Sequence, residues 1–205
     1  MKYKNIISKN NQGICYLTIN RPNQLNALNQ LTISELNTAI IKADNDKSIR
    51  CIILTGSGDK AFVAGADIKE FADFNPILGH ELAKKGQDLL FDLIENIGTP
   101  SIAAVNGFAL GGGLELAMAA HIRIASNNAK MGLPEVSLGV IPGYGGTQRL
   151  ANLVGKGKAL EMITTASMLT SNEAKEWGLV NHVCNQEELI STAEKIASKI
   201  KKNSP

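Results

Sequence analysis

Short apolar runs alternate with longer amphipathic stretches in the first part of the chain. Residues 13–20, GICYLTIN, are rich in β-branched and aromatic types and stop at Arg21-Pro22, where proline cannot continue a ladder, so we predict a strand. Asn29 precedes apolar positions at helical spacing, which predicts an N-cap and a helix. The continuous apolar run 51–55 is typical of a strand covered on both faces.

The alternation continues to the end of the chain. Leucines and an isoleucine between residues 82 and 97 follow helical spacing up to a Gly-Thr-Pro break, and a strand is predicted at 101–105. Strands that alternate with crossover helices predict a mostly parallel α/β core. The remaining pattern predicts strands at 121–126 and 179–184, and helices at 146–155, 158–166 and 187–202.

A glycine run interrupts the chain between a strand and a helix. Residues 109–120, ALGGGLELAMAA, contain Gly111, Gly112 and Gly113 before a single carboxylate, Glu115. A helix that begins near Gly112 would direct unpaired N–H groups to one point, where an anion or a carbonyl oxygen can bind. Alternatively, the glycines only allow the helix to pack closely on the sheet.

A second turn of small residues favours the binding interpretation. Ala64, Gly65, Ala66 and Asp67 follow the preceding strand unit. Two such turns on adjacent parallel strands would lie at the same carboxyl edge of the sheet, where one N–H from each could meet on a single oxygen. The loss of one donor from such an oxyanion hole costs about 3 kcal/mol of transition-state stabilisation.

Two glutamates in apolar surroundings are candidates for acid-base chemistry. Glu115 lies one turn into the helix after the glycine run, and Glu135 lies in MGLPEVSLGVIPGYGG, residues 131–146. A buried carboxylate is costly unless it is paired or titrates, so it is a reasonable acid or base. The structural alternative is an ion pair with Arg123 or Arg149.

Composition excludes several classes of protein. The 205 residues are 44% hydrophobic and carry a formal net charge of +2, which suits one globular domain, residues 1–205, and offers no basic stripe for nucleic acid. We see no signal peptide and no membrane span, so we expect a cytoplasmic protein. The three cysteines form no CxxC pair, and the isolated histidines match no metal ligand set, so we expect buried thiols and no metal.

Four motifs together resemble the crotonase family, and specifically its enoyl-CoA hydratases. The resemblance implies a spiral of β-β-α units, a coenzyme A thioester as the substrate, no separate cofactor, and a homotrimer or a dimer of trimers. It runs in order along essentially the whole chain. The motifs are NRPNQLNALN (20–29), AFVAGADIKEF (61–71), AAVNGFALGGGLELAMAAHIRIAS (103–126) and MGLPEVSLGVIPGYGGTQRL (131–150).

The resemblance also assigns roles to single positions. The N–H groups of Ala66 and Gly112 match the two donors to the thioester oxygen, and Glu115 and Glu135 match the pair that holds and activates one water. Gly143 matches the glycine whose helix start faces the acyl group. The remaining positions match the surroundings of coenzyme A: Ala64, Ala66, Asp67, Ile68 and Lys69 line the thioester and pantetheine, and Leu25 and Ala27 lie at the adenine end.

These roles imply syn addition of water to a 2-enoyl-CoA. The alternatives are an enoyl-CoA isomerase or another crotonase-type acyl-CoA enzyme, and a non-catalytic protein that binds coenzyme A thioesters or RNA. Glu115 favours hydration, since a single acid-base group can suffice for a double-bond shift. The motifs do not determine the acyl chain length or the pathway.

Two features depart from the family pattern. His121 stands where relatives commonly have an acidic residue, and we interpret it as structural because it falls past the site helix. The chain stops at KIKKNSP, where the family continues into a C-terminal helical segment, so we expect that segment to be truncated.

Overall fold

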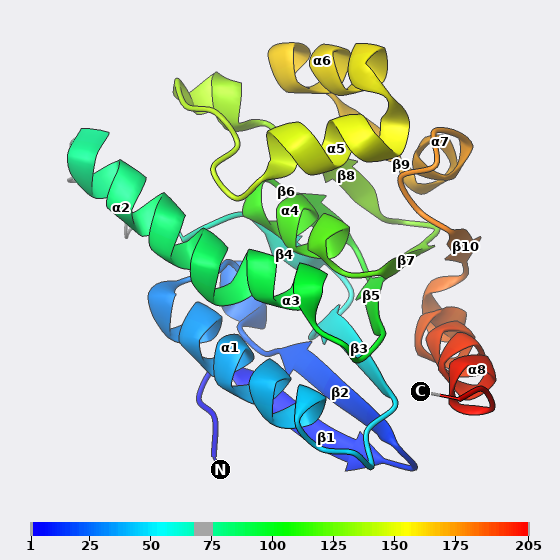
Figure 1. Ribbon diagram of the computed structural model, residues 1–205. Coiled ribbons are helices and arrows are strands. Elements are labelled where there is room, and N and C mark those ends of the chain that lie inside the picture. Colours follow the sequence, from blue (N-terminus) through cyan, green and yellow to red (C-terminus); the bar gives the residue numbers. More distant parts are fainter. Residues whose placement is uncertain (1, 68–75, 205) are drawn as a thin grey trace.

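A six-stranded sheet forms the centre of the computed structural model, which describes residues 2–67 and 76–204 (Figure 1). Its order is β1-β2-β3-β5-β7-β10, and every neighbouring pair is parallel except β1 with β2. The predicted parallel core is therefore confirmed. The strands are β1 (Ile6–Asn11), β2 (Ile14–Ile19), β3 (Cys51–Gly56), β5 (Ser101–Val105), β7 (Ile122–Ser126) and β10 (His182–Cys184).

A second sheet has the order β4-β6-β8-β9, with β4, β6 and β8 parallel. These strands have three or four residues each, too few for a readable period, and the hydrophobic pattern did not predict them. Strand pairs β3-β4, β5-β6 and β7-β8 each send one strand to each sheet before the chain enters a helix, which is the expected β-β-α repeat. The strands are β4 (Ala61–Ala64), β6 (Phe108–Leu110), β8 (Lys130–Gly132) and β9 (Met168–Thr170).

The longer helices lie where the pattern predicts, whereas α7 was not predicted. Asn29 caps α1 (Gln30–Asp44) by accepting a hydrogen bond from the N–H of Thr32. The helix expected before residue 98 is α2 (Pro76–Gly86) and α3 (Asp92–Asn96), joined by a π-helical turn, η3 (Gln87–Phe91). The other helices are η1 (Pro22–Gln24), α4 (Gly112–Ala119), η4 (Glu135–Leu138), α5 (Gly146–Val154), α6 (Lys156–Thr165), α7 (Ser171–Glu176), η5 (Gln186–Glu188) and α8 (Leu189–Lys201).

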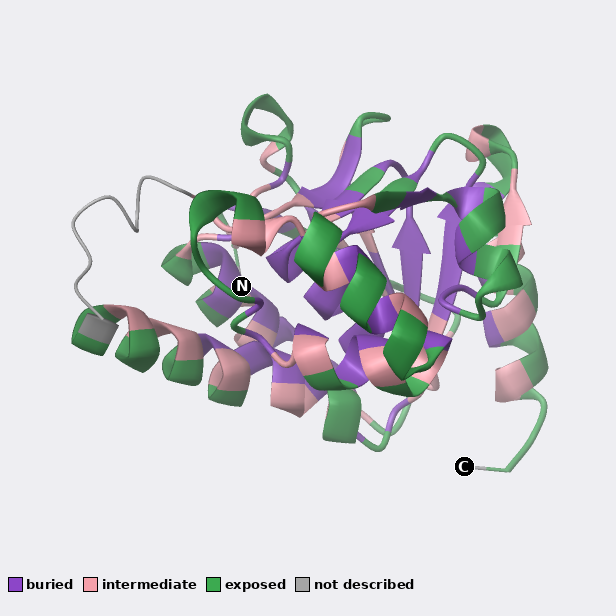
Figure 2. Ribbon diagram, turned by 90° about the horizontal axis from the view of Figure 1, so that it is seen from above, coloured by how far each residue is buried: buried purple, intermediate pink, exposed green. Residues whose placement is uncertain are grey.

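Both faces of the six-stranded sheet are covered (Figures 1 and 2). Ile52 and Leu54 of β3 face the larger apolar core, which includes side chains of α1 and α4, while Ile53 faces a smaller core beneath α8. Alternate strand residues enter opposite cores because successive side chains point to opposite faces. Parallel strands that are buried on both sides explain the continuous apolar runs in the sequence.

Among the described residues, no helix is both long enough and apolar enough to span a bilayer. All three cysteines are free thiols; Cys15 and Cys51 are buried, and Cys184 is half-buried.

Candidate active site

The two turns of small residues lie side by side at the edge of the smaller sheet. They follow β4 and β6, which are parallel neighbours with Ala64 opposite Leu110. A methyl group on Gly112 would lie 3.9 Å from the backbone nitrogen of Ala66. The turns were expected on adjacent parallel strands, and these strands belong to the second sheet.

The hydrogen bonds on either side of Ala66 determine the direction of its N–H group. Leu28 bridges to Ala66, but the hydrogen bonds run from the Leu28 N–H to Gly65 and from the Asp67 N–H to Leu28. The Ala66 N–H therefore lies on the opposite side of its strand. Gly112 is the first residue of α4, so its N–H has no acceptor within the helix.

The sequence left two explanations open for the glycine run, a binding turn and close packing of the helix on the sheet, and different glycines fit each of them. Gly111 has φ +51° and ψ −125°, a conformation essentially restricted to glycine. A methyl group on Gly113 would lie 2.0 Å from the carbonyl oxygen of Val63, so that glycine lets α4 pack directly on β4. Gly113 thus serves packing, whereas Gly111 and Gly112 shape the turn next to the carboxylates.

Glu115 is only 1% exposed and is held by backbone donors. Its Oε1 atom accepts hydrogen bonds from the N–H groups of Tyr144 and Gly146, both at 2.8 Å. These donors lie at the start of α5, about thirty residues along the chain. The side chain in the first turn of one helix is therefore fixed by the first turn of another.

Glu135 approaches the same turn from η4. A methyl group on Gly111 would lie 2.9 Å from Oε1 of Glu135, so the carboxylate fits against this glycine because it has no side chain. Oε2 of Glu135 is buried and has no hydrogen-bond partner among the described residues. An unpaired buried carboxylate oxygen is rare in a purely structural role.

Burial raises the pKa of both carboxyl groups. For Glu115 the pKa rises to about 7, because burial and the charge of Glu135 outweigh the N–H donors of Gly146 and Tyr144 and the charge of Arg149. Burial also raises the pKa of Glu135. The charge of Glu135 thus contributes to the raised pKa of Glu115.

The arginines considered as ion-pair partners bind elsewhere. Arg123 is buried and donates to carbonyl oxygens at the C-terminal end of α4, among them Met118 at 3.2 Å and Ala120. Arg149 donates to the Tyr144 carbonyl at 2.6 Å and pairs with Glu95 at 2.6 Å. In the part of the chain that the structure describes, neither arginine forms an ion pair with Glu115 or Glu135.

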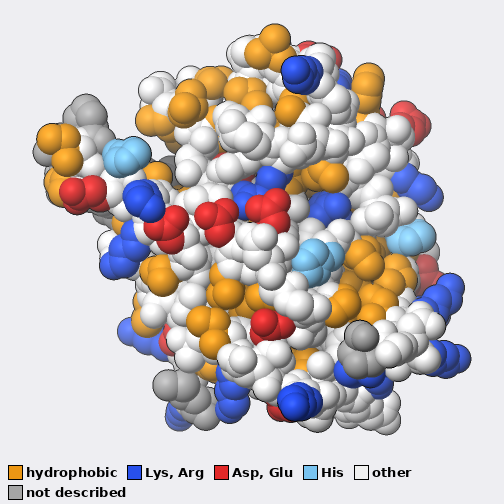
Figure 3. All heavy atoms as spheres, in the orientation of Figure 1, with side chains coloured by type: hydrophobic (Ala, Val, Ile, Leu, Met, Phe, Trp, Pro, Cys, Tyr) orange, Lys and Arg blue, Asp and Glu red, His pale blue; other side chains and the backbone are white. Residues whose placement is uncertain are grey.

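Arg149 nevertheless acts close to the site. It fixes the carbonyl of the residue whose N–H binds Glu115, and its second acidic partner is Asp92 at 3.3 Å. Asp92 and Glu95 both lie on α3, and Figure 3 shows acidic and basic side chains in a row on this face of the molecule. Arg149 was predicted only as a possible partner of the glutamates, and its role at Tyr144 was missed because the acidic partners that orient it lie more than fifty residues away in the chain.

The residues expected at the adenine end lie next to the first turn. The carbonyl of Leu25 accepts a hydrogen bond from Ala64 N–H at 3.1 Å, and the carbonyl of Ala27 accepts one from Arg21. Arg21 also pairs with Asp67 at 2.8 Å. Ile68 and Lys69 lie outside the described residues. Leu25, Ala27, Ala64, Ala66 and Asp67 therefore form one neighbourhood.

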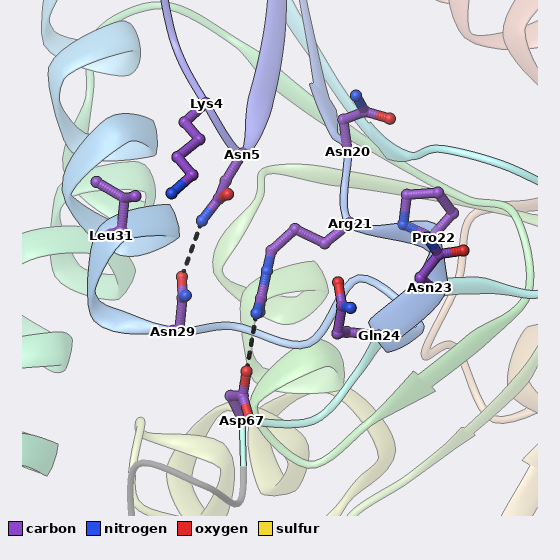
Figure 4. Close-up of a pocket in the computed structure, with 10 residues that line it drawn as sticks. All are labelled: Lys4, Asn5, Asn20, Arg21, Pro22, Asn23, Gln24, Asn29, Leu31 and Asp67. Atoms are coloured by element: carbon purple, nitrogen blue, oxygen red, sulfur yellow. Dashed lines mark hydrogen bonds and ion pairs between the residues drawn. The ribbon is translucent and has the colours of Figure 1, made fainter.

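A surface pocket of about 470 Å³ opens beside this neighbourhood (Figure 4). Arg21 and Asp67 meet in it, and the amide of Asn5 donates to Asn29. Neither glutamate lines this pocket. It is a polar depression separate from the carboxylate pair.

Gly143 is exposed and lies beside α2, where a methyl group would meet Ala83 at 3.5 Å.

His121 has a structural role away from the two glutamates. Its Nδ1 atom lies 3.0 Å from the backbone nitrogen of Ser101, and its Nε2 atom lies 3.3 Å from the Glu95 carbonyl oxygen. No group of three or more metal-ligating side chains occurs in the part of the chain that the structure describes.

The comparisons with known proteins agree with this arrangement. Residues 9–205 match the family model described as enoyl-CoA hydratase/isomerase. The chain is 49% identical over 205 residues to the short-chain-enoyl-CoA hydratase of Clostridium acetobutylicum, covering all of this chain and 78% of that protein. It is 48% identical over 200 residues to the crotonyl-CoA hydratase of Syntrophomonas wolfei, covering 98% and 76%.

Solved structures show the same fold. The crystal structure of an enoyl-CoA hydratase from Bacillus anthracis superposes with a TM-score of 0.92 at 40% identity, covering 98% of this chain and 78% of that one. The fold, the two adjoining turns and the carboxylate pair thus define a crotonase-type protein. The chain belongs to the enoyl-CoA hydratase/isomerase family.

Proposed function

We propose that the protein is an enoyl-CoA hydratase, a lyase that adds water syn across the 2,3 double bond of a 2-enoyl-CoA to give a 3-hydroxyacyl-CoA. The observation that carries the proposal is the placement of two carboxyl groups, the buried Glu115 and the half-buried Glu135, around the turn that begins at Gly111. The family and the hydratases to which the chain is similar support the same reaction.

The thioester carbonyl would bind between the N–H groups of Ala66 and Gly112. Donors at this position polarise the carbonyl and draw electrons from the conjugated double bond, so the β-carbon becomes electrophilic. The negative charge that develops as water adds falls on the thioester oxygen. The N–H donors are preorganised by β4 and α4, so they need not rearrange during the reaction.

The carboxyl pair would divide the proton transfers. Glu115, fixed by two N–H donors, holds the water and takes its proton as the hydroxyl oxygen bonds to the β-carbon. Glu135 delivers a proton to the α-carbon, which completes the addition. Raised pKa values at both positions suit a pair in which one group is ionised and the other protonated.

The resemblance supports further proposals about the surroundings. We propose that residues 1–205 form the core domain, that Leu25, Ala27, Ala64, Asp67, Ile68, Lys69 and Gly143 line the acyl-CoA site, and that no separate cofactor takes part. We also propose a cytoplasmic homotrimer or dimer of trimers. Exposed apolar side chains after Glu135, namely Leu138, Val140 and Ile141, are consistent with assembly.

The direct test is hydration of crotonyl-CoA by the purified protein, followed as loss of the conjugated thioester absorbance. Product analysis with a 3-enoyl-CoA separates the alternatives, because an isomerase yields the 2-enoyl product without hydration. Glu135→Gln should reduce kcat about 100-fold or more while binding of a saturated acyl-CoA stays nearly unchanged. A wild-type protein that binds acyl-CoA but turns over no enoyl-CoA would contradict the proposal.

A further inference from the structure

The aromatic ring of Tyr144 is buried beside the two turns. Tyr144 is 6% exposed, and a methyl group on Gly112 would lie 3.4 Å from its Cδ2 atom and 3.5 Å from its Cε2 atom. The same methyl position lies 3.9 Å from the Ala66 nitrogen. The ring edge therefore stands next to the place where we expect the thioester carbonyl.

Neighbouring elements hold the ring in this position. It stacks on Phe91 of η3, with ring centres 4.4 Å apart and planes 8° from parallel. On α2, a methyl group on Gly86 would lie 2.5 Å from the ring's Cε1 atom and 3.2 Å from its hydroxyl oxygen. The ring therefore occupies the space that the missing side chain of Gly86 leaves between α2 and α4.

The backbone of the same residue is tied to the carboxylate pair. The Tyr144 N–H donates to Glu115, and its carbonyl accepts from Arg149. These bonds place the Tyr144 Cα near the carboxylate that would hold the attacking water. If the substrate carbonyl lies at Gly112 and its β-carbon lies near Glu115, Tyr144 is next to the substrate. The Tyr144 ring then extends from the substrate to α2.

We propose that the ring of Tyr144 closes the acyl pocket toward α2 and limits the enzyme to short 2-enoyl-CoA thioesters such as the four-carbon crotonyl group. This inference rests on the proposed function. A longer acyl chain requires the volume that the ring fills. Because the ring is stacked on Phe91 and packed against Gly86, it cannot swing aside without losing both contacts.

The test compares chain-length profiles of wild type, Tyr144→Ala and Tyr144→Phe. For each protein, kcat/KM is measured with four-, six-, eight- and ten-carbon 2-enoyl-CoA substrates. In Tyr144→Ala, the ratio of kcat/KM for the eight-carbon substrate to kcat/KM for the four-carbon substrate should rise at least about tenfold. Differences in pocket volume change the preference between substrates by about this factor. Tyr144→Phe keeps the ring and should keep the wild-type ratio.

Two further variants distinguish an effect of the missing ring from an effect of lower stability. Tyr144→Leu opens less space and should give a smaller shift in the same direction. Ile53→Ala creates a cavity in the separate core beneath α8 and should leave the ratio at its wild-type value despite lower stability. A ratio that moves equally in Ile53→Ala would contradict a role for the ring.

Binding gives a readout that does not depend on turnover. Calorimetric Kd values of butanoyl-, hexanoyl- and octanoyl-CoA should differ between wild type and Tyr144→Ala chiefly for the longer chains. If wild type binds these ligands with this profile but hydrates none, the proposed function fails and the pocket assignment stands. If folded Tyr144→Ala and Tyr144→Leu keep the wild-type profiles in both assays, the assignment is overturned.

Discussion

Oε1 of Glu115 lies 2.8 Å from the backbone nitrogen of Gly146, and a methyl group on Gly146 would lie 2.8 Å from that same oxygen. The methyl group would also approach Cγ of Glu115 to 2.9 Å. The carboxylate and the start of α5 therefore fit together only because residue 146 has no side chain.

Gly146→Ala should displace the Glu115 carboxylate and lower kcat about 100-fold, since misplacement of a reacting group by about 1 Å has effects of this size. The matched control is Gly157→Ala, near the start of α6, where a methyl group meets nothing within 4 Å. Steady-state kinetics with crotonyl-CoA would check the prediction. Equal kcat values in the two variants would show that the contact does not matter for turnover.

Gly111→Ala should weaken folding and also disturb Glu135. The residue has φ +51°, and an added methyl group would lie 2.9 Å from Oε1 of Glu135. Gly155→Ala is the control, because Gly155 has φ +80° but nothing within 4 Å of the methyl position. Both variants should lose about 1–3 kcal/mol of stability in denaturant unfolding. Only Gly111→Ala should also lose turnover, so an equal kcat in both would argue against the placement of Glu135.

Stability should depend on pH through Glu115. Its pKa is about 7 in the folded protein against an ordinary value of 4.5, so between these values the folded state binds more protons than the unfolded state. Stability from this group is fully present below pH 4.5 and is lost as pH rises through 7, by about 3 kcal/mol in total. Glu115→Gln should abolish this component.

The measurement is urea unfolding of wild type and Glu115→Gln at several values between pH 4.5 and 8. The difference between the two proteins isolates Glu115 from other titrating groups. The variant should gain stability relative to wild type as pH rises across this window. A constant difference would mean that the pKa of Glu115 is not raised.

Arg149 should act as a positioning residue for Glu115. Lysine at this position cannot donate to the Tyr144 carbonyl and to Glu95 with the same fork geometry. Arg149→Lys should therefore lower kcat about tenfold through misplacement of the Tyr144 N–H, with KM for crotonyl-CoA within about twofold of wild type.

Arg123→Lys provides the comparison, since Arg123 is equally buried but binds carbonyls at the far end of α4. It should lose stability with little change in kcat. If both lysine variants lost kcat in proportion to stability, Arg149 would have only a structural role.

Much of the architecture could be predicted from local pattern. Asn29 marked the start of α1, the apolar runs at 51–55 and 101–105 marked two central strands, and the glycine run marked the start of α4. The short strands β4, β6, β8 and β9 could not be predicted this way. Each pairs with strands that are distant in sequence, and a strand of three or four residues is too short to show a hydrophobic period.

The amino-acid sequence by itself determined which elements form and which residue types stand at the two turns and the two carboxyl positions, because caps, glycine conformations and apolar periodicity act over a few residues. Only the tertiary structure decided what these groups contact. It set the N–H groups of Tyr144 and Gly146 on Glu115, the Tyr144 ring between Gly86 and Gly112, and Arg149 on Glu95. Such contacts arise from the packing of whole helices and strands, and no local pattern records them.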